Sequence, residues 1–409
     1  MRFLFVHQNF PGQYLHLVRH LAANSNNEVV FITQREDGEM TGVRKIVYKP
    51  ARAITPEVHH YLRETEAAVL NAQNVARVAL DLRNSGFVPD VILGHNGWGE
   101  LWYLKDVFKT TPLIGYFEFF YRFEGADVGF EPGPPLIFDE APRVRTKNIG
   151  NLLALDTVDL GQCPTQWQRS LYPEVYRPKI RVVHEGIDTD VCKPDPTATV
   201  AVPGSDLVLA PQDEVITFVA RNLEPYRGFP SFMRSLPAIL QARPRARVLI
   251  VGGDETSYGP RPADGISFRA RMLEELKGRL DLSRVHFMGK VPYSVFLSIL
   301  RVSSVHVYLT YPFVLSWSML EAMACGCAVV GSRTPPVEEV IRHGHNGWLV
   351  DIFAPDAIAA QVIDVLESPD AAEPVRERAR AHVVEHYDLR TKCLPRQLKM
   401  IQAALSLDL

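Results

Sequence analysis

The chain has 409 residues, a formal net charge of −3, 46% hydrophobic residues and 22% charged residues. This composition supplies packed cores and excludes a disordered chain, and the near-neutral charge provides no general attraction to nucleic acid. The length favours two domains, because single cores stop growing at about 250 to 300 residues. Five scattered cysteines form neither a disulfide framework nor a CxxC pair, which fits a reducing cytoplasm.

Neither a signal peptide nor a membrane span is expected. The opening residues MRFLFVHQNF hold too short an apolar run for a signal peptide, and nowhere do about 18 apolar residues follow one another. We therefore expect a cytoplasmic protein, peripheral at most to the inner face of a membrane. Several basic residues are candidates for contact with an anionic membrane, although a solvated surface explains them better because acidic and apolar residues interleave with them. They are Arg44, Lys45, Lys49, Arg52, Arg376, Arg378 and Arg380.

The first half alternates short apolar runs with helical patterns. Residues 2–6 predict a strand, which a Pro–Gly loop and a helix follow. Further strands are expected at residues 29–32, 90–93 and 112–117, with a long helix over residues 56–84. Continuous apolar runs are typical of parallel strands buried on both faces.

The second half repeats the pattern, with strands expected at residues 215–220, 247–251, 285–288, 305–309 and 328–330, each before a helix. Residues 188–212 are rich in Asp, Pro, Thr and Gly and show no periodicity, which indicates a connection. We expect an N-terminal domain over residues 1–190, a linker over 191–212 and a C-terminal domain over 213–385. A helical tail, with a kink or break at Pro395, would pack toward the N-terminal domain over residues 386–409. In such doubly wound sheets, ligands bind at the carboxyl ends of the strands.

The segment 308–330 is the strongest candidate for chemistry. A strand is expected to end near Tyr311, and a helix to run from about Ser318 to Gly326. The free N–H groups and positive dipole at the helix start suit a phosphate. Glu321 lies one turn inside the helix, where its carboxylate can accept from ribose hydroxyls. The spelling Ser318-x-x-Glu321 equally matches a capping box, in which the glutamate only satisfies backbone donors.

A second segment, FVARNLEPYRG, places Arg221 and Arg227 on a loop that leaves a strand. Two fixed guanidinium groups suit a diphosphate whose negative charge grows as a glycosyl bond breaks. Solvated surface arginines are the alternative.

Ordered motifs along the whole chain carry a resemblance. They are LEAMACGCAVVGS at 320–332, EEVIRHGHNGWLV at 338–350, HEGID at 184–188, VGGD at 251–254 and HFMGKVP at 286–292. The sequence resembles the retaining glycosyltransferases of family four, which are nucleotide-sugar-dependent enzymes of the GT-B class. The resemblance implies an α/β fold of two Rossmann-like, doubly wound domains that face a central cleft, with a C-terminal helix that crosses back to the first domain.

The resemblance also implies roles for particular residues. Arg221 and Arg227 would hold the donor diphosphate and stabilise it as it leaves, and Glu321 would bind the ribose. Backbone groups of the loop would meet the diphosphate and sugar, at Val314, Leu315, Ser316, Trp317 and Ser318. Lys290 and Val291 would lie near the nucleobase. Gly12 would allow close approach to the donor phosphate, with a simple turn as the alternative.

Two positions depart from the family pattern. Phe313 stands eight residues before Glu321, where relatives carry the first glutamate of their Glu-x7-Glu motif. Glu118 stands where many relatives have a histidine facing the sugar, and is a catalytic candidate that can bind a hydroxyl or oppose positive charge in the transition state. Alternatively, it pairs with Arg122. His95 is an acceptor-side candidate, or merely a satisfied polar residue.

Metal motifs are set aside. Asp188-Thr-Asp190 has the spelling of a DxD metal motif but is better explained as a turn, and Cys325 and Cys327 have no second ligand cluster. The resemblance implies no metal and no other cofactor.

The expected function is transfer of a sugar from a nucleotide diphosphate sugar to a hydroxyl of a saccharide or lipid-linked saccharide, in polysaccharide or glycoconjugate synthesis. The partners would be the nucleotide sugar and that acceptor, without nucleic acid and with a possible peripheral membrane contact. The alternatives are a nucleotide-sugar epimerase and a catalytically inactive nucleotide-sugar-binding subunit, which the loss of the motif glutamate at Phe313 favours.

Overall fold

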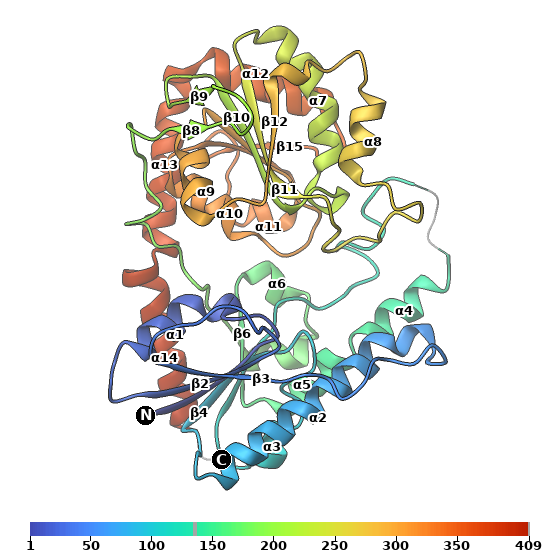
Figure 1. Cartoon of the computed structure of the whole chain (residues 1–409), viewed down its shortest axis with the longest axis vertical. Helices are drawn as coiled ribbons and strands as arrows, with labels where there is room; N and C mark the ends of the chain where they lie inside the picture. The colour runs from blue at the N-terminus through green and yellow to red at the C-terminus, as the bar shows by residue number, and fades with distance from the viewer. Residues whose placement is uncertain (134–136, 408–409) are drawn as a thin grey trace. The chain divides into compact units, whose positions relative to one another are not determined.

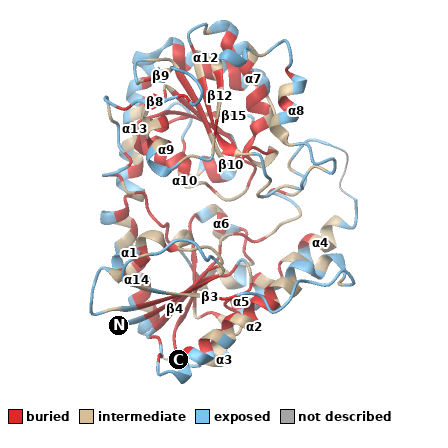
Figure 2. Cartoon of the chain, viewed as in Figure 1, coloured by how far each residue is buried: buried red, intermediate tan, exposed pale blue. Residues whose placement is uncertain are grey.

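The computed structural model describes residues 1–133 and 137–407 and divides into two compact units (Figure 1). Unit 1 comprises Met1–Gly186 and Leu389–Leu409, and unit 2 comprises Ile187–Asp388. Each unit has its own parallel sheet, buried between helices (Figure 2). Among the residues described, no helix is both long enough and apolar enough to cross a bilayer.

The sheet of unit 1 has the strand order β3-β2-β1-β4-β5-β6-β7, with every pair parallel. Its strands are β1 (Arg2–Val6), β2 (Glu28–Thr33), β3 (Val43–Val47), β4 (Val91–His95), β5 (Leu113–Tyr116), β6 (Leu160–Cys163) and β7 (Ile180–Val182). The four strands expected in this half are present. The sequence analysis did not predict β3, β6 and β7. The strands β6 and β7 have only four and three residues, and the apolar residues of β3, which lies at the sheet edge, are interrupted by Arg44 and Lys45.

Helices surround this sheet and include the C-terminal tail. They are α1 (Leu15–Ala22), α2 (Arg63–Asn84), α3 (Leu104–Val107), α4 (Glu140–Lys147), α5 (Ile149–Thr157), α6 (Gln166–Ser170) and α14 (Leu394–Leu405). Met400, Ile401 and Ala404 of α14 are buried in one core cluster with Phe3 and Phe5 of β1. This burial holds the tail in unit 1, as expected for a helix that returns to the first domain.

The sheet of unit 2 has the order β12-β11-β10-β13-β14-β15 and is also parallel. Its strands are β10 (Val215–Asn222), β11 (Arg247–Gly253), β12 (Val285–Gly289), β13 (Val305–Tyr308), β14 (Ala328–Ser332) and β15 (Trp348–Val350). Its helices are α7 (Phe229–Ala242), α8 (Phe268–Glu275), α9 (Tyr293–Arg301), α10 (Trp317–Ala324), α11 (Pro335–Glu338), α12 (Pro355–Glu367) and α13 (Pro369–Tyr387). The five strands expected here are present.

The residues expected as a linker, 191–212, lie inside unit 2. They form an antiparallel pair of two-residue strands, β8 (Val200–Ala201) and β9 (Val208–Leu209). Val200 and Leu209 are buried in a cluster with Leu249 and Val251 of β11. The segment is therefore packed, and its strands were too short to give a periodic signal.

The tail is helical, as expected, with a break just before Pro395. Helix α13 ends at Tyr387, a π-helical turn follows over Leu389–Cys393, and α14 begins at Leu394. Pro395 therefore lies in the first turn of α14, where its missing N–H costs no helical hydrogen bond.

Candidate functional site

In unit 2, the loops that leave β10, β11 and β13 are joined to one another by buried polar contacts. Parallel strands bring these loops to one edge of the sheet, which is where ligands bind in this class of fold. The candidate donor-side residues follow the carboxyl ends of these strands and of β12.

Arg227 is buried, with 6% of its surface exposed. Its Nη1 donates to Tyr308 Oη at 3.2 Å, to Thr310 Oγ1 at 2.9 Å and to the Val314 carbonyl at 3.0 Å. Burial alone would lower the pKa of Arg227, but the neighbouring Tyr308 and Tyr258 raise it above its ordinary value. For Arg227, the surface interpretation is therefore wrong: the guanidinium is a fixed positive charge that holds the loop after β13.

Arg221 is the penultimate residue of β10, and its side chain is exposed. Arg221 therefore lies within the strand and not on the expected loop, whereas Arg227 follows the strand and is fixed by the contacts described above. A phosphate contact for either residue stays a prediction.

Glu224, which the sequence analysis did not single out, fastens the neighbouring loop. Its buried carboxylate accepts from the N–H groups of Ser257, Tyr258 and Gly259 at 2.9, 3.1 and 2.9 Å. A carboxylate between the two arginines was the available signal in the sequence. The loop after β11 is thereby held against the turn that carries Arg227.

Helix α10 begins one residue before the expected position. Ser316 is its N-cap: the Oγ accepts from the Ser318 N–H at 3.3 Å, and the Ser316 N–H donates to Tyr308 Oη at 2.8 Å. The capping-box interpretation of Ser318 and Glu321 is wrong, because Ser316 occupies the cap and the carboxylate of Glu321 accepts from Tyr293 Oη at 2.8 Å. Leu315 is buried, whereas Val314 and Trp317 are half-buried.

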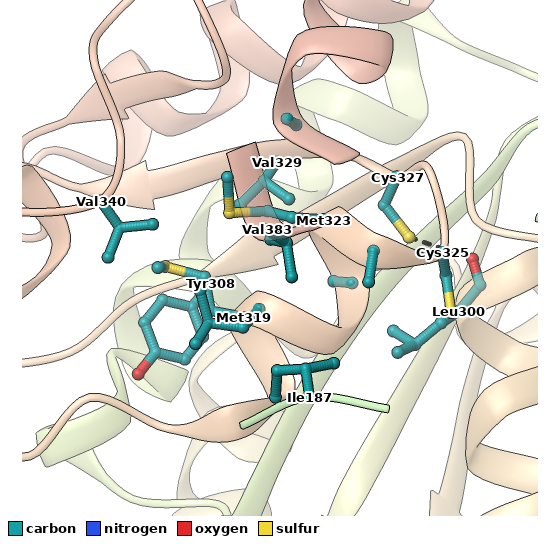
Figure 3. Close-up of a cluster of buried hydrophobic side chains, with 14 of the residues drawn as sticks. Ile187, Leu300, Tyr308, Met319, Met323, Cys325, Cys327, Val329, Val340 and Val383 are labelled. Carbon is teal, nitrogen blue, oxygen red and sulfur yellow. Dashed lines mark hydrogen bonds between the residues drawn. The ribbon is translucent and has the colours of Figure 1, made fainter. Parts of the chain in front are cut away.

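The side of α10 that carries Met319 and Met323 packs into the core of unit 2, in one cluster with Tyr308 and Val329 (Figure 3). Cys327 Sγ donates to the Leu300 carbonyl at 3.0 Å, and both Cys325 and Cys327 are buried (Figure 3). This packing fixes the direction of the helix start. Both cysteines therefore serve as small core residues at the helix end.

Glu321 is an unusual carboxylate, with only 8% of its surface exposed. Burial raises its pKa to about 7, and the hydrogen bond from Tyr293 opposes this shift only in part. Tyr293 Oη also lies 3.3 Å from Cys192 Sγ. The carboxylate is thus held in place by Tyr293. The sequence analysis missed this residue because it lies in α9, 28 residues before Glu321, and only the folded chain brings the two side chains together. Ribose binding by Glu321 stays a prediction.

Lys290 and Val291 follow β12, as expected. Lys290 Nζ pairs with Glu255 Oε2 at 3.0 Å on the surface, and Val291 is half-buried against the core. Their place near a nucleobase stays a prediction.

An aromatic cluster occupies the region of the expected first motif glutamate. The ring of Phe313 lies edge-on to Tyr226 at 5.6 Å and at 5.1 Å from Tyr258, while Tyr226 stacks on Tyr311 at 4.9 Å. The guanidinium carbon of Arg227 lies 5.0 Å from the centre of the Tyr258 ring. Phe313 therefore adds an apolar side chain beside a fixed cation, where relatives would present a carboxylate.

In unit 1, a chain of hydrogen bonds joins the first loop to Glu118. His7 Nδ1 accepts from the Asn9 N–H at 2.8 Å, so His7 Nε2 carries the proton and donates to Gln13 Oε1 at 2.6 Å. Gln13 Nε2 donates in turn to Glu118 Oε1 at 2.9 Å. Burial, reinforced by His95, holds the pKa of His7 well below its ordinary value. Gln13 was missed by the sequence analysis.

Gly12 lies directly over this chain, with a φ of 56°. A Cβ on this residue would stand 2.5 Å from His7 Nε2. The turn therefore requires glycine for its own packing, and close approach to a donor phosphate is a separate prediction.

His95, at the end of β4, completes the cluster. Its Nδ1 accepts from the Gly97 N–H at 2.9 Å, which leaves Nε2 protonated and 3.7 Å from Glu118 Oε2. His95 is 2% exposed, and its Nε2 has no hydrogen-bond partner in the described part of the chain. The structure thus brings Gly12, His95 and Glu118 together, as neighbours on the carboxyl ends of β1, β4 and β5. Arg122, the other proposed partner of Glu118, donates to the Leu171 carbonyl at 2.7 Å.

The segment Asp188-Thr-Asp190, which has the spelling of a metal motif, forms a turn. The Asp190 N–H donates to Asp188 Oδ1 at 3.3 Å, as in a turn. Over residues 1–133 and 137–407, no group of three His, Cys, Asp or Glu side chains is placed to hold a metal ion.

Family models match both units, and curated relatives match parts of the chain. Residues 25–192 match the glycosyl transferase family 4 group, and residues 206–382 match the glycosyl transferases group 1. D-inositol 3-phosphate glycosyltransferase of Streptomyces coelicolor is 27% identical, over 50% of this chain and 46% of its own. Phosphatidyl-myo-inositol mannosyltransferase of Mycobacterium tuberculosis is 30% identical, over 43% and 44%. The matched region spans about half the length of these curated relatives.

Solved structures resemble the whole chain. Sucrose-phosphate synthase of Thermosynechococcus elongatus covers 99% of both chains with a TM-score of 0.73 and 17% identity. Anabaena HepE, in its complex with UDP and glucose, covers 99% of this chain and 100% of its own, with a TM-score of 0.68 and 16% identity. These likenesses confirm the GT-B fold of two Rossmann-like parallel units. The two family models together cover most of the chain, which therefore belongs to the glycosyltransferases, with its first unit matching the family 4 group and its second unit matching group 1.

Proposed function

We propose that the protein is a retaining hexosyl- or related glycosyltransferase. It would move a sugar from a nucleotide diphosphate sugar to a hydroxyl of a saccharide or lipid-linked saccharide, in polysaccharide or glycoconjugate synthesis. The observation that carries this proposal is the buried guanidinium of Arg227, which is fixed by three acceptors beside the loop that leads into α10.

A fixed cation at this place has a chemical use in glycosyl transfer. The leaving nucleoside diphosphate gains negative charge as the glycosyl bond breaks, and a preorganised positive group stabilises that charge without rearrangement. Arg221 would add a second guanidinium, and the start of α10 would add backbone N–H groups and the positive end of its dipole. Glu321 would accept from the ribose hydroxyls.

Retention of configuration needs no protein nucleophile in this scheme. The acceptor hydroxyl would attack the anomeric carbon on the face from which the diphosphate departs, and its proton would pass to the leaving phosphate. Glu118, held by Gln13 and close to His95, would bind a sugar or acceptor hydroxyl from unit 1. Binding of both substrates would exclude water, which otherwise competes as the acceptor.

The experiment begins by finding the donor. Nucleotide sugars that bind the folded protein raise its melting temperature, so a thermal-shift panel identifies the base and sugar. Turnover with that donor is then measured for wild type, Arg221→Ala and Arg227→Ala. We expect each variant to lose about a hundredfold or more in turnover, as when a preorganised donor is removed from an anion site. Wild-type turnover in both folded variants would contradict the proposal.

Product analysis separates the alternatives. An epimerase would convert the donor to a new sugar nucleotide without any acceptor. An inactive binding subunit, which the aromatic side chain of Phe313 favours, would bind the donor in calorimetry with neither transfer nor hydrolysis. We further propose a cytoplasmic location. We also propose that the enzyme holds no metal, since arginines supply the positive charge, and we therefore expect undiminished turnover in excess EDTA.

A further inference from the structure

A second candidate binding site lies in unit 1, along the outer side of β7, the last strand of its sheet. There, a groove of about 580 Å³ is lined by residues from α6, from β7 and the residues beside it, and from α14. This volume lies within the range of about 300 to 1,000 Å³ found for small-molecule sites. None of its lining residues belongs to the candidate site described above.

The groove is cationic at its rim. Four basic side chains line it and no carboxylate does. One of them, Arg169, is already engaged, because its Nε and Nη2 donate to the carbonyls of Arg177 and Ile180. Arg181, Arg396 and Lys399 are exposed, and none forms an ion pair within the described residues. In a chain with a net charge of −3, this cluster is a local feature.

The positions of these three residues bring their charges to one face. Arg396 and Lys399 are three residues apart on α14 and so are neighbours on its surface. Arg181 and Val183 are two residues apart in extended chain and point to the same side, and Val183 is buried in the cluster that contains Met400 of α14. Arg181 therefore stands on the α14 side of the sheet edge.

The inner wall of the groove is apolar. Ile180, Val183 and Met400 are buried residues that line it, and Ala403 continues the wall one turn further along α14. A small residue at position 403 keeps the groove open. The site thus combines three available cations with an adjoining apolar surface.

We propose that this groove binds the phosphate group of an amphiphile. The phosphate would lie against Arg181, Arg396 and Lys399, since guanidinium groups bind phosphate oxygens in pairs and lysine adds a point charge. The apolar body would lie along Met400 and Ala403. A phospholipid head group in a membrane and a free phosphorylated amphiphile present this same chemistry, and the experiment distinguishes them. The proposal is independent of the proposed glycosyltransferase activity.

The test measures binding, with two probes. Dihexanoylphosphatidic acid, used as a soluble monomer, is titrated into the full-length protein by calorimetry. Vesicles of phosphatidylcholine, with or without phosphatidic acid, are used for co-sedimentation. The test variant is Arg396→Glu with Lys399→Glu. The matched control is Arg245→Glu with Lys277→Glu, two exposed cations of unit 2 whose replacement changes the net charge equally.

We expect the test variant to bind at least one probe about tenfold or more weakly, because it loses charge-assisted hydrogen bonds to the phosphate. The control variant should bind both probes as wild type does. Loss confined to vesicles identifies a membrane head group, and loss confined to the soluble probe identifies a free ligand. The Ala403→Trp variant fills the groove without changing charge and should weaken the same binding. Absence of binding to both probes, or equal loss in test and control variants, would overturn the proposal.

Discussion

Glu321 should make the stability of the protein fall as pH rises. Burial raises its pKa in the folded chain to about 7, against an ordinary value of 4.5. The folded state therefore keeps this proton to a higher pH than the unfolded state does. Its contribution to stability is fully present below pH 4.5 and is lost as pH rises through 7. A shift of about 2.5 units corresponds to roughly 3 kcal/mol in the free energy of unfolding.

The substitution Glu321→Gln removes this titration and keeps the contact, because an amide oxygen also accepts from Tyr293 Oη. We expect the variant and wild type to differ little near pH 5. By pH 8 the variant should gain up to about 3 kcal/mol in unfolding free energy relative to wild type. Urea unfolding followed by tryptophan fluorescence at several pH values measures this difference.

The matched control is Glu255→Gln. This exposed carboxylate pairs with Lys290, which lowers its pKa, so its removal should not produce a gain that grows with pH. A difference between wild type and Glu321→Gln that stays constant from pH 5 to pH 8 would refute the reasoning.

Three further substitutions test the contacts of the candidate residues in unit 2 and in unit 1. Gly228→Ala should lower the unfolding free energy by about 1 to 3 kcal/mol, because Gly228 has a φ of 66° and an added Cβ would stand 2.4 Å from Leu309 Cβ. The control is Gly278→Ala, which has a φ of 74° but no atom within 4 Å of an added Cβ, and it should cost less in the same urea denaturation assay. Tyr308→Phe should cost about 1 kcal/mol or more, since its hydroxyl bonds both Arg227 and the Ser316 N–H, and equal stability in urea would contradict this role. Glu118→Gln should keep the hydrogen bond from Gln13 and lower turnover about a hundredfold with little change in melting temperature; an unchanged kcat would remove Glu118 from the mechanism.

Much of the fold could be predicted from the sequence because buried parallel strands read as continuous apolar runs. The strands β1 and β10 are such runs, with most of their residues buried. The apolar residues of the edge strand β3 are interrupted by two adjacent basic residues, and each strand of the hairpin at 200–209 has only two residues. These elements depend on neighbours distant in sequence, so no local pattern reveals them.

The sequence indicated which residues belong to the candidate site, but it did not indicate the contacts that these residues make. Arg227 and Glu321 follow strand ends, which the chain order alone indicates. Whether an arginine is a solvated surface group or a buried one depends on acceptors about 80 residues away, such as Tyr308 and Thr310. The raised pKa of Glu321 likewise depends on burial, which only the packed unit establishes. The sequence analysis placed the helix start at Ser318, and only the hydrogen bonds identify Ser316 as the N-cap of α10.

The most direct measurement is a crystal structure with the nucleoside diphosphate that gives the largest rise in melting temperature. The proposed mechanism predicts that the two phosphates lie at the carboxyl edge of the unit 2 sheet, against Arg221, Arg227 and the backbone N–H groups at the start of α10. Well-ordered ligand bound elsewhere on the protein, with this edge empty, would contradict it.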